Sequence, residues 1–205
     1  ATDGSWSITS SSLSDDDYAI TATATDDAGN VSSLSTSFNM TVDTTAPTVT
    51  VALSDTALKA GETATVTFTF SETPIGFAEG DITAANGDIT SLQVDGSNPN
   101  VYTATFTPTS DITDASNIIS VSTAYSDAAG NTGVGNESDN FTIDTGAPSV
   151  SSVAITSATN AANNLLNAGD VVSVTVTMDE ATFVTGSPFI TLTIGGTTKQ
   201  ASYAS

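Results

Sequence analysis

The sequence repeats itself at a fixed interval, and this constrains the fold more than any other feature. Asp26-Asp27-Ala28-Gly29-Asn30 is followed, seventeen residues after its first Asp, by Asp43-Thr44-Thr45-Ala46-Pro47. A matching pair, Asp127-Ala128-Ala129-Gly130-Asn131 and Asp144-Thr145-Gly146-Ala147-Pro148, has the same separation and lies 101 residues further on. This period is too long for a solenoid unit of about 20 to 50 residues and fits one small globular domain. The chain is therefore predicted to be part of a domain array.

A second set of residues recurs at a slightly longer interval. Gly61-Glu62 and the run Val66 to Phe70 reappear 108 residues later as Gly169-Asp170 and Val174 to Met178. The additional seven residues are expected in the Asn- and Ala-rich stretch Thr159 to Asn167. The predicted organisation is the C-terminal half of one repeat over residues 1–45, a complete repeat over residues 46–147 and the N-terminal part of a third repeat over residues 148–205.

Composition excludes several functions. The chain has 23 acidic residues, two Lys and no Arg or His, which gives a formal net charge of −21. Nucleic acid is excluded as a partner because phosphate binding needs a basic stripe, and an anionic membrane surface is disfavoured for the same reason. No apolar run reaches the roughly 20 residues of a membrane span, so direct membrane insertion is not expected.

Catalysis also lacks its usual residues. With no His and no Cys, nucleophile–base pairs and thiol chemistry are missing. Paired carboxylates can hydrolyse glycosides, but this needs a cleft that short sandwich loops do not provide. The absence of Cys also means that a small extracellular domain must be stabilised without disulfides. We therefore expect no enzyme, and carboxylates that bind a hard metal ion offer the alternative stabilisation.

Alternation of apolar and polar residues at period two indicates strands throughout the chain. Turn-forming residues separate these runs. About seven strands in about 100 residues, with no convincing helix, predict an all-β fold of tandem immunoglobulin-like β-sandwiches arranged end to end. The expected strands of the complete repeat include Val49–Leu53, Thr65–Phe70, Val101–Phe106, Ile118–Tyr125 and Asn140–Ile143, and the expected turns include Ser71–Gly76, Asn86–Asp88, Asp111–Asn117 and Asp127–Gly135.

With the seven strands of a sandwich lettered A to G in chain order, the first partial repeat is expected to carry the last three, E, F and G. Trp6 and Ile8 are predicted to lie on its E strand, and the run from Tyr18 to Ala22 on its F strand. Tyr18 follows Leu13 and three acidic residues, as in the tyrosine corner of sandwich domains, where the phenol bonds to backbone upstream. An ordinary core tyrosine at the start of a strand is an equally good interpretation.

The ordered set of motifs resembles the bacterial immunoglobulin-like repeats of giant secreted adhesins. The motifs are Asp43 to Pro47 opening a repeat, Ala60-Gly61-Glu62 before a Val-Thr-Phe-Thr-Phe-Ser-Glu strand, Tyr102 to Pro108, and Asp127 to Asn131 closing the repeat. The resemblance implies a long extracellular stalk of tandem sandwiches at the bacterial cell surface, often stiffened by calcium at the domain junctions. Ser187 to Gly196 departs from this pattern, so the third repeat is expected to be of a different subtype.

Sandwich topology predicts where the acidic residues gather. The end of strand B and the F–G loop face the linker that enters the complete repeat, which places Glu72, Asp127 and Asn131 near Asp43. The E–F loop of the preceding repeat is expected to bring Asp15 and Asp17 to the same junction. A second junction is expected to use Asp144 and Glu180, while Asp26 and Asn30 are expected to face a junction further upstream.

Crowded carboxylates repel one another unless a cation neutralises them. Calcium is the expected cofactor because it accepts six to eight oxygen ligands in flexible geometry, whereas zinc and copper favour His or Cys. The Gly of each Asp-x-x-Gly-Asn loop is predicted to turn the chain with a positive φ. The alternative interpretation is that these acids are ordinary solvated turn residues.

The expected function is that of a structural spacer or stalk section in a bacterial adhesin or fibre. The expected partners are adjacent Ig-like repeats of the same polypeptide and, in a fibre, other copies. Two alternatives stay open: a module that recognises a glycan or host protein through loops such as Pro74 to Gly80, with Phe77 as its aromatic contact, and a subunit of an assembled extracellular filament.

Overall fold

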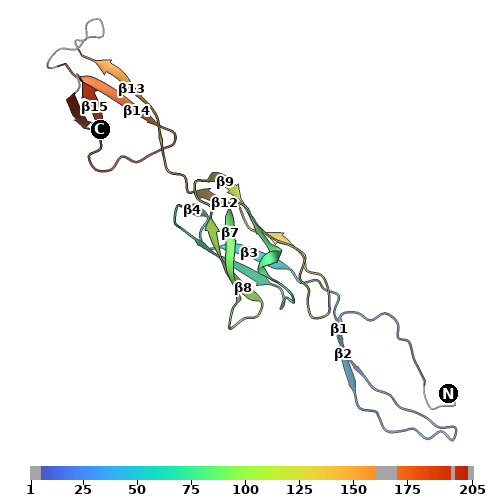
Figure 1. The fold of residues 1–205 in the computed structure, drawn as a ribbon. Coiled ribbons are helices and arrows are strands. Elements are labelled where there is room, and N and C mark those ends of the chain that lie inside the picture. The colour runs from blue at the N-terminus through green and yellow to red at the C-terminus, as the bar shows by residue number, and fades with distance from the viewer. Residues whose placement is uncertain (1–5, 160–169, 195–196, 203–205) are drawn as a thin grey trace. The chain divides into compact units, whose positions relative to one another are not determined.

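A computed structural model of the chain describes residues 6–159, 170–194 and 197–202. The chain divides into two compact units, Ala1–Gly146 and Ala147–Ser205. Within the described residues every named element is a β-strand except one turn of 3₁₀ helix, η1 (Glu79–Asp81) (Figure 1). The all-β prediction is therefore confirmed. The insertion predicted between Thr159 and Asn167 and the recurrence at Gly169 fall almost wholly outside the described residues.

Residues 46–146 form a complete two-sheet sandwich within the first unit. One sheet has the order β3-β5-β8-β7 and is antiparallel throughout. The opposing layer contains the groups β4-β12-β9 and β11-β10-β6, in which β4 and β12 run parallel. The strands are β3 (Val49–Leu53), β4 (Ala57–Lys59), β5 (Ala64–Phe70), β6 (Ile82–Ala84), β7 (Gly87–Val94), β8 (Val101–Pro108), β9 (Thr113–Asn117), β10 (Ile119–Val121), β11 (Asn136–Glu137) and β12 (Phe141–Asp144).

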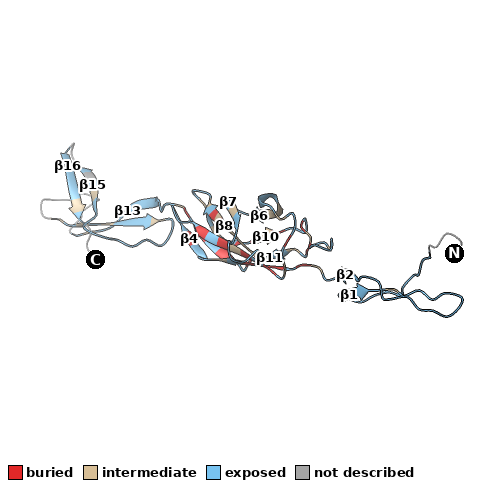
Figure 2. Cartoon of the chain, turned by 90° about the horizontal axis from the view of Figure 1, so that it is seen from below, coloured by how far each residue is buried: buried red, intermediate tan, exposed pale blue. Residues whose placement is uncertain are grey.

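Strand β5 shows why this sequence folds as a sandwich. Its side chains alternate between the interior and the opposite face, and Ala64, Val66, Phe68 and Phe70 are all buried. Across the sandwich, the ring of Phe70 lies edge-on to Tyr125 with centroids 5.1 Å apart, and Phe106 meets Phe141 at 5.3 Å. Among the residues whose burial the structure describes, the buried side chains all lie in this sandwich (Figure 2). Packing between the two sheets therefore replaces the disulfides that the chain lacks.

Two segments predicted to be turns are strands in the structure. β9 occupies residues predicted as a turn at 111–117, and β7 begins at Gly87, inside the predicted turn at 86–88. Asn117 is buried, and its Nδ2 donates to the carbonyl oxygens of Asp114 and Phe141, so a turn-type residue is satisfied inside a sheet. The strand predicted over 118–125 shortens to β10, because Tyr125 begins the hydrogen-bonded loop that leads to β11.

The first segment forms a two-stranded hairpin of β1 (Asp16–Ile20) and β2 (Phe38–Val42). The E strand predicted around Trp6 and Ile8 is wrong, since residues 6–14 contain no strand and both side chains are exposed. In the complete repeat the E strand β8 lies between β5 and β7, and residues 6–45 supply no such neighbours. The Tyr18 hydroxyl donates to the carbonyl oxygen of Ser14 at 3.0 Å, which is the backbone contact predicted for a tyrosine corner.

In its described residues, the second unit contains two antiparallel strand pairs. β13 (Val150–Ala158) pairs with β14 (Val172–Met178), and β15 (Phe189–Ile194) pairs with β16 (Thr197–Ser202). The pairing of β13 with β14 follows that of β3 with β5, because Val49 faces Phe70 and Val150 faces Met178. The first pair of strand neighbours thus follows the recurrence at 101 and 108 residues, and a β-bulge between Val150 and Ser152 shifts the next pairs by one residue.

Truncating Phe68 tests the dependence of the sandwich on its core. Phe68→Ala removes a fully buried ring, and we expect it to lower the free energy of unfolding by about 3–5 kcal/mol. The measurement is urea unfolding followed by far-ultraviolet circular dichroism. Thr69→Ala, on the exposed face of the same strand, is the control and should cost less than about 1 kcal/mol. Equal losses for the two variants would contradict the assigned faces.

Candidate functional site

Three carboxylates meet where the linker enters the complete sandwich. Asp43 directly follows β2, Glu72 lies two residues after β5, and Asp127 lies in the loop between β10 and β11. One carboxylate oxygen from each lies within 4.8 Å of the other two. Asp127 is buried, while Asp43 and Glu72 are half-buried. The structure thus brings together the three acids that sandwich topology placed at this junction, and whether they bind a metal ion stays a prediction.

The loop that holds Asp127 is closed by its own hydrogen bonds. The backbone N–H groups of Gly130 and Asn131 donate to Oδ1 of Asp127 at 2.7 and 2.8 Å, and Nδ2 of Asn131 donates to Oδ2 at 2.7 Å. Gly130 has φ of 93°, as its predicted role requires. These bonds fix the position of the carboxylate without any metal ion. Oδ2 keeps accepting capacity for one further partner.

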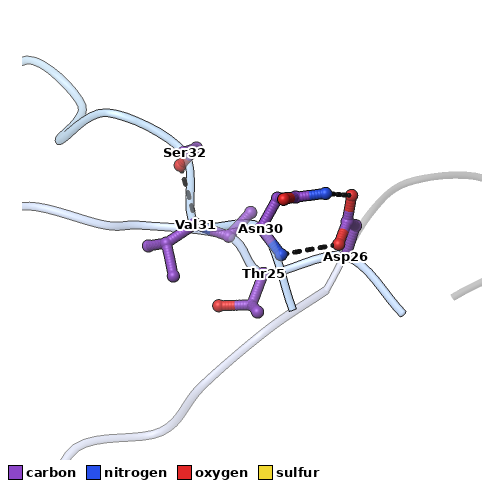
Figure 3. Close-up of a pocket in the computed structure, with 6 residues that line it drawn as sticks. Thr25, Asp26, Asn30, Val31 and Ser32 are labelled. Atoms are coloured by element: carbon purple, nitrogen blue, oxygen red, sulfur yellow. Dashed lines mark hydrogen bonds between the residues drawn. The ribbon is translucent and has the colours of Figure 1, made fainter. Parts of the chain in front are cut away.

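The same loop occurs in the first segment. Oδ1 of Asp26 accepts from the backbone N–H of Asn30, and Oδ2 accepts from Nδ2 of Asn30, both at 2.8 Å (Figure 3). Gly29 has φ of 90°. The Asp-x-x-Gly-Asn motif is therefore first a self-bracing turn, in which Asp replaces missing backbone acceptors. The junction upstream that these residues were predicted to face is not represented, so their role as ligands stays a prediction.

Asn131 also joins the loop to the linker. Its Nδ2 donates to the carbonyl oxygen of Asp43 at 3.0 Å, in addition to its bond with Asp127. Nearby, the N–H of Val134 and the hydroxyl of Tyr125 both donate to the carbonyl oxygen of Pro47, at 2.9 and 3.3 Å. The linker is thus tied to the sandwich by backbone acceptors, which leaves the Asp43 carboxylate to face the other two acids.

The pKa values of Glu72 and Asp127 in this cluster shift in opposite directions. Burial raises the pKa of Glu72, and the negative charges of Asp127 and Asp43 raise it further. Burial also acts to raise the pKa of Asp127, but the hydrogen bonds from Asn131 and Gly130 outweigh it, so this pKa lies below its ordinary value. The ionised form of Asp127 is therefore stabilised by its loop, whereas repulsion from the other two carboxylates disfavours ionisation of Glu72.

Asp15 and Asp17 are placed differently from the prediction. Asp15 accepts from the hydroxyls of Thr44 and Thr45 at 2.8 and 3.1 Å, and Asp17 accepts from the hydroxyl of Thr41 at 2.6 Å. Among the described residues, neither belongs to the group of three carboxylates within 4.8 Å. The hydrogen bond from Thr44 is the largest cause that lowers the pKa of Asp15. Asp15 thus braces the linker through its threonines, whereas Asp17 bonds to its cross-strand neighbour in the β1–β2 hairpin, and neither joins the cluster.

The residues predicted for a second junction lie in different units. Asp144 ends β12 and accepts from the Thr113 hydroxyl at 3.0 Å, while Glu180 follows β14. A site shared by Asp144 and Glu180 stays a prediction.

Threonines of the linker motif have a role that sequence reasoning missed. The Thr145 side chain is buried, and its hydroxyl donates to the Thr109 carbonyl at 2.7 Å and accepts from the Ile112 N–H at 3.0 Å. Its counterpart Thr44, 101 residues earlier, binds Asp15. The recurrence of Thr after each Asp was the available signal, and it marks a brace between the linker and the preceding E–F region.

Phe77 is not an exposed recognition residue. It packs on the core, with its ring edge-on to Phe68, Phe70, Tyr102 and Tyr125 at centroid distances of 4.9 to 6.1 Å. The aromatic contact that was considered for a recognition module is therefore a half-buried residue that packs against the core of the sandwich. Among the described residues, no helix is long and apolar enough to cross a membrane.

Comparison with known protein families agrees with the fold. Residues 43–143 match one bacterial Ig-like domain family, and residues 1–44 match a second. The two matches together span residues 1–143, so the chain belongs to the bacterial Ig-like domain proteins, whose domains are typically structural modules of surface or extracellular proteins. No curated protein and no solved structure matches the chain.

Removing the charge of Glu72 tests the repulsion at this site. Because its folded-state pKa lies above the ordinary 4.5, ionisation of Glu72 costs stability as pH rises through that folded-state value. In chelator, Glu72→Gln should therefore be more stable than the parent chain at pH 7, by up to about 1 kcal/mol for a partly exposed group. At pH 3.5 the difference should disappear. Urea unfolding at both pH values measures it, and a difference independent of pH would contradict the repulsion.

Proposed function

We propose that this chain is a section of the stalk of a bacterial surface adhesin or fibre, in which calcium binds at the junction that enters the complete repeat. The observation that carries the proposal is the convergence of Asp43, Glu72 and Asp127 from three separated segments. A linker residue and two residues of the sandwich share this cluster, so an ion held there would join the linker to the domain.

The chemistry of the donor set fits calcium. All three side chains offer hard carboxylate oxygens, and the chain has no His or Cys to favour zinc or copper. Three carboxylates provide between three and six of the six to eight oxygens that calcium accepts, with carbonyl groups and water available for the rest. A bound calcium ion would supply two positive charges where the raised pKa of Glu72 indicates uncompensated negative charge.

The mechanical consequence follows from where the three acids are attached. Glu72 and Asp127 are fixed to the sandwich, because Glu72 follows β5 and the Asp127 loop is closed by its own bonds. Asp43 belongs to the linker, whose other ties to the sandwich include single hydrogen bonds to Asn131, Val134 and Tyr125. Neutralising the cluster removes the repulsion that pushes Asp43 away, so the linker loses freedom to bend.

Calcium would also favour folding outside the cell. A ligand that binds only the folded state stabilises it by RT ln(1 + [L]/Kd), and extracellular calcium modules have Kd values of about 10⁻⁴ to 10⁻³ M. Millimolar calcium therefore stabilises the folded repeat, while the low concentration in the cytosol leaves it easier to unfold before export. This suits a secreted stalk with no disulfides.

Calcium titration with matched variants tests the proposal. The parent chain should bind calcium with a Kd of about 10⁻⁴ to 10⁻³ M in isothermal titration calorimetry, and its unfolding temperature should rise with calcium. Asp127→Asn and Glu72→Gln should each weaken binding by tenfold or more. Asp88→Asn removes an exposed acid of β7 and should leave binding unchanged. Equal loss in all three variants would indicate general attraction to an acidic surface.

Small-angle scattering tests stiffening separately from binding. We expect a larger and more narrowly distributed maximum dimension in calcium than in chelator for the parent chain, and no difference for Asp127→Asn. An unchanged distribution in a parent chain that binds calcium would remove the mechanical role and keep the metal site.

A further inference from the structure

The chain crosses from one sheet of the sandwich to the other through a turn with strict steric requirements. This turn, Ala85 and Asn86, connects β6 to β7. Asn86 has φ of 58°, a left-handed conformation that Asn adopts more readily than most residues. A Cβ atom on Gly87 would lie 2.5 Å from the ring of Phe106 and 2.6 Å from the carbonyl oxygen of Thr107, so only glycine fits there. The fold thus favours Asn followed by Gly at this turn, and the sequence contains this dipeptide once.

An Asn-Gly pair can react with itself. The glycine nitrogen can attack Cγ of the Asn side chain, because glycine has no side chain to restrict the backbone or hinder the approach. A new C–N bond forms, the attacking nitrogen loses its proton, and the side-chain nitrogen leaves as ammonia, which produces a succinimide ring. Water then opens the ring to aspartate or isoaspartate. The reaction needs the side-chain amide and the following peptide group to rotate into contact.

Both reacting groups of this pair are held by hydrogen bonds in the folded repeat. Nδ2 of Asn86 donates to Oδ2 of Asp114 at 2.9 Å and to Oδ1 of Asn117 at 2.8 Å. The carbonyl oxygen of Asn86 accepts from the Thr109 N–H at 2.9 Å, which fixes the peptide plane that contains the Gly87 nitrogen. Neither group can rotate toward the other while these bonds hold.

The two side chains that hold the amide are themselves fixed. Asn117 is 1% exposed, and its Nδ2 donates to the carbonyl oxygens of Asp114 and Phe141, which leaves its Oδ1 for Asn86. Oδ1 of Asp114 accepts from the Ser116 N–H at 2.9 Å, while Oδ2 accepts from Asn86. Strand β9 therefore forms a rigid acceptor site for the Asn86 amide.

We propose that Asn86 is a site of spontaneous deamidation, which the folded repeat prevents and the unfolded repeat permits. Unfolding breaks the bonds to Asp114, Asn117 and Thr109 and frees both reacting groups. The product cannot restore these bonds, because a carboxylate has no N–H to donate and its charge is repelled by Asp114. The loss of ammonia is irreversible, so the repeat keeps a permanent chemical mark of time spent unfolded. The inference does not rest on the proposed calcium site.

Peptide mass spectrometry of the 205-residue chain tests this inference. The chain is incubated in chelator at mildly alkaline pH, either folded in buffer or unfolded in urea, and the peptide that contains Asn86 is followed with time. A reaction that needs the open state is slowed in proportion to the population of that state, so the amide should be lost roughly tenfold or more faster in urea. Equal rates in the two conditions, or an amide that persists in urea, would overturn the inference.

Variants of Asp114 separate the hydrogen bonds of the amide from general stability. Asp114→Ala removes one acceptor and should speed the loss of the Asn86 amide in the folded chain, whereas Asp114→Asn keeps an oxygen acceptor and should stay slow. Phe68→Ala is the control, because it weakens the core and leaves the three hydrogen-bonding residues in place. Urea is adjusted until circular dichroism gives equal unfolded fractions. If Asp114→Ala then reacts no faster than Phe68→Ala, these bonds do not protect the amide.

The effect of the product is tested by a direct substitution. Asn86→Asp places the new carboxylate beside Asp114 and should lower the urea concentration at which the repeat unfolds. Asn98→Asp adds the same charge at an exposed turn, where a carboxylate can still accept the bond from the Asn100 N–H. Its unfolding midpoint should stay closer to that of the parent chain. Equal shifts in the two variants would show that the Asn86 amide has no special role in the folded repeat.

Discussion

Burial of one sheet face against another is the interaction on which the rest of this structure depends. The chain has no Cys for disulfides, so the sandwich rests on Phe68, Phe106 and Phe141 and the aliphatic residues around them. The loops that carry the acidic cluster are anchored by this packing, since Glu72 lies two residues after the buried end of β5 and Asp127 two residues after the buried Tyr125. The apolar side chains of Ile20 in β1 and of Val153 and Val176 in β13 and β14 are exposed.

The packed sandwich holds a cluster of carboxylates where the linker enters it. Asp127 and Glu72 are only a few ångströms apart, yet their pKa values move in opposite directions because only Asp127 receives several hydrogen bonds. The hydrogen bonds of its loop therefore stabilise the charged form of Asp127, while the repulsion among the carboxylates disfavours the charged form of Glu72.

Much of the fold could be predicted from the sequence, since alternation at period two and the 101-residue recurrence report directly on strand faces and domain length. The convergence of Asp43, Glu72 and Asp127 also followed from topology, because strand ends at one pole of a sandwich must lie near each other. The predictions that were wrong concerned residues whose structure depends on contacts with distant parts of the chain, which the local sequence does not encode. The turn-like residues 113–117 form a strand because Asn117 finds backbone partners inside the sandwich. Trp6 and Ile8 have a strand pattern but no neighbouring strands, and Asp15 is held by threonines of the linker.

The self-bracing Asp-x-x-Gly-Asn loop has a consequence for how such arrays evolve. Because the loop is ordered by its own bonds, little conformational entropy is left to lose when the loop engages a ligand. In the proposed calcium junctions, differences in affinity would then come from the acids around the loop. The turn that recurs at Asp26 and Asp127 could thus serve joints of different affinity.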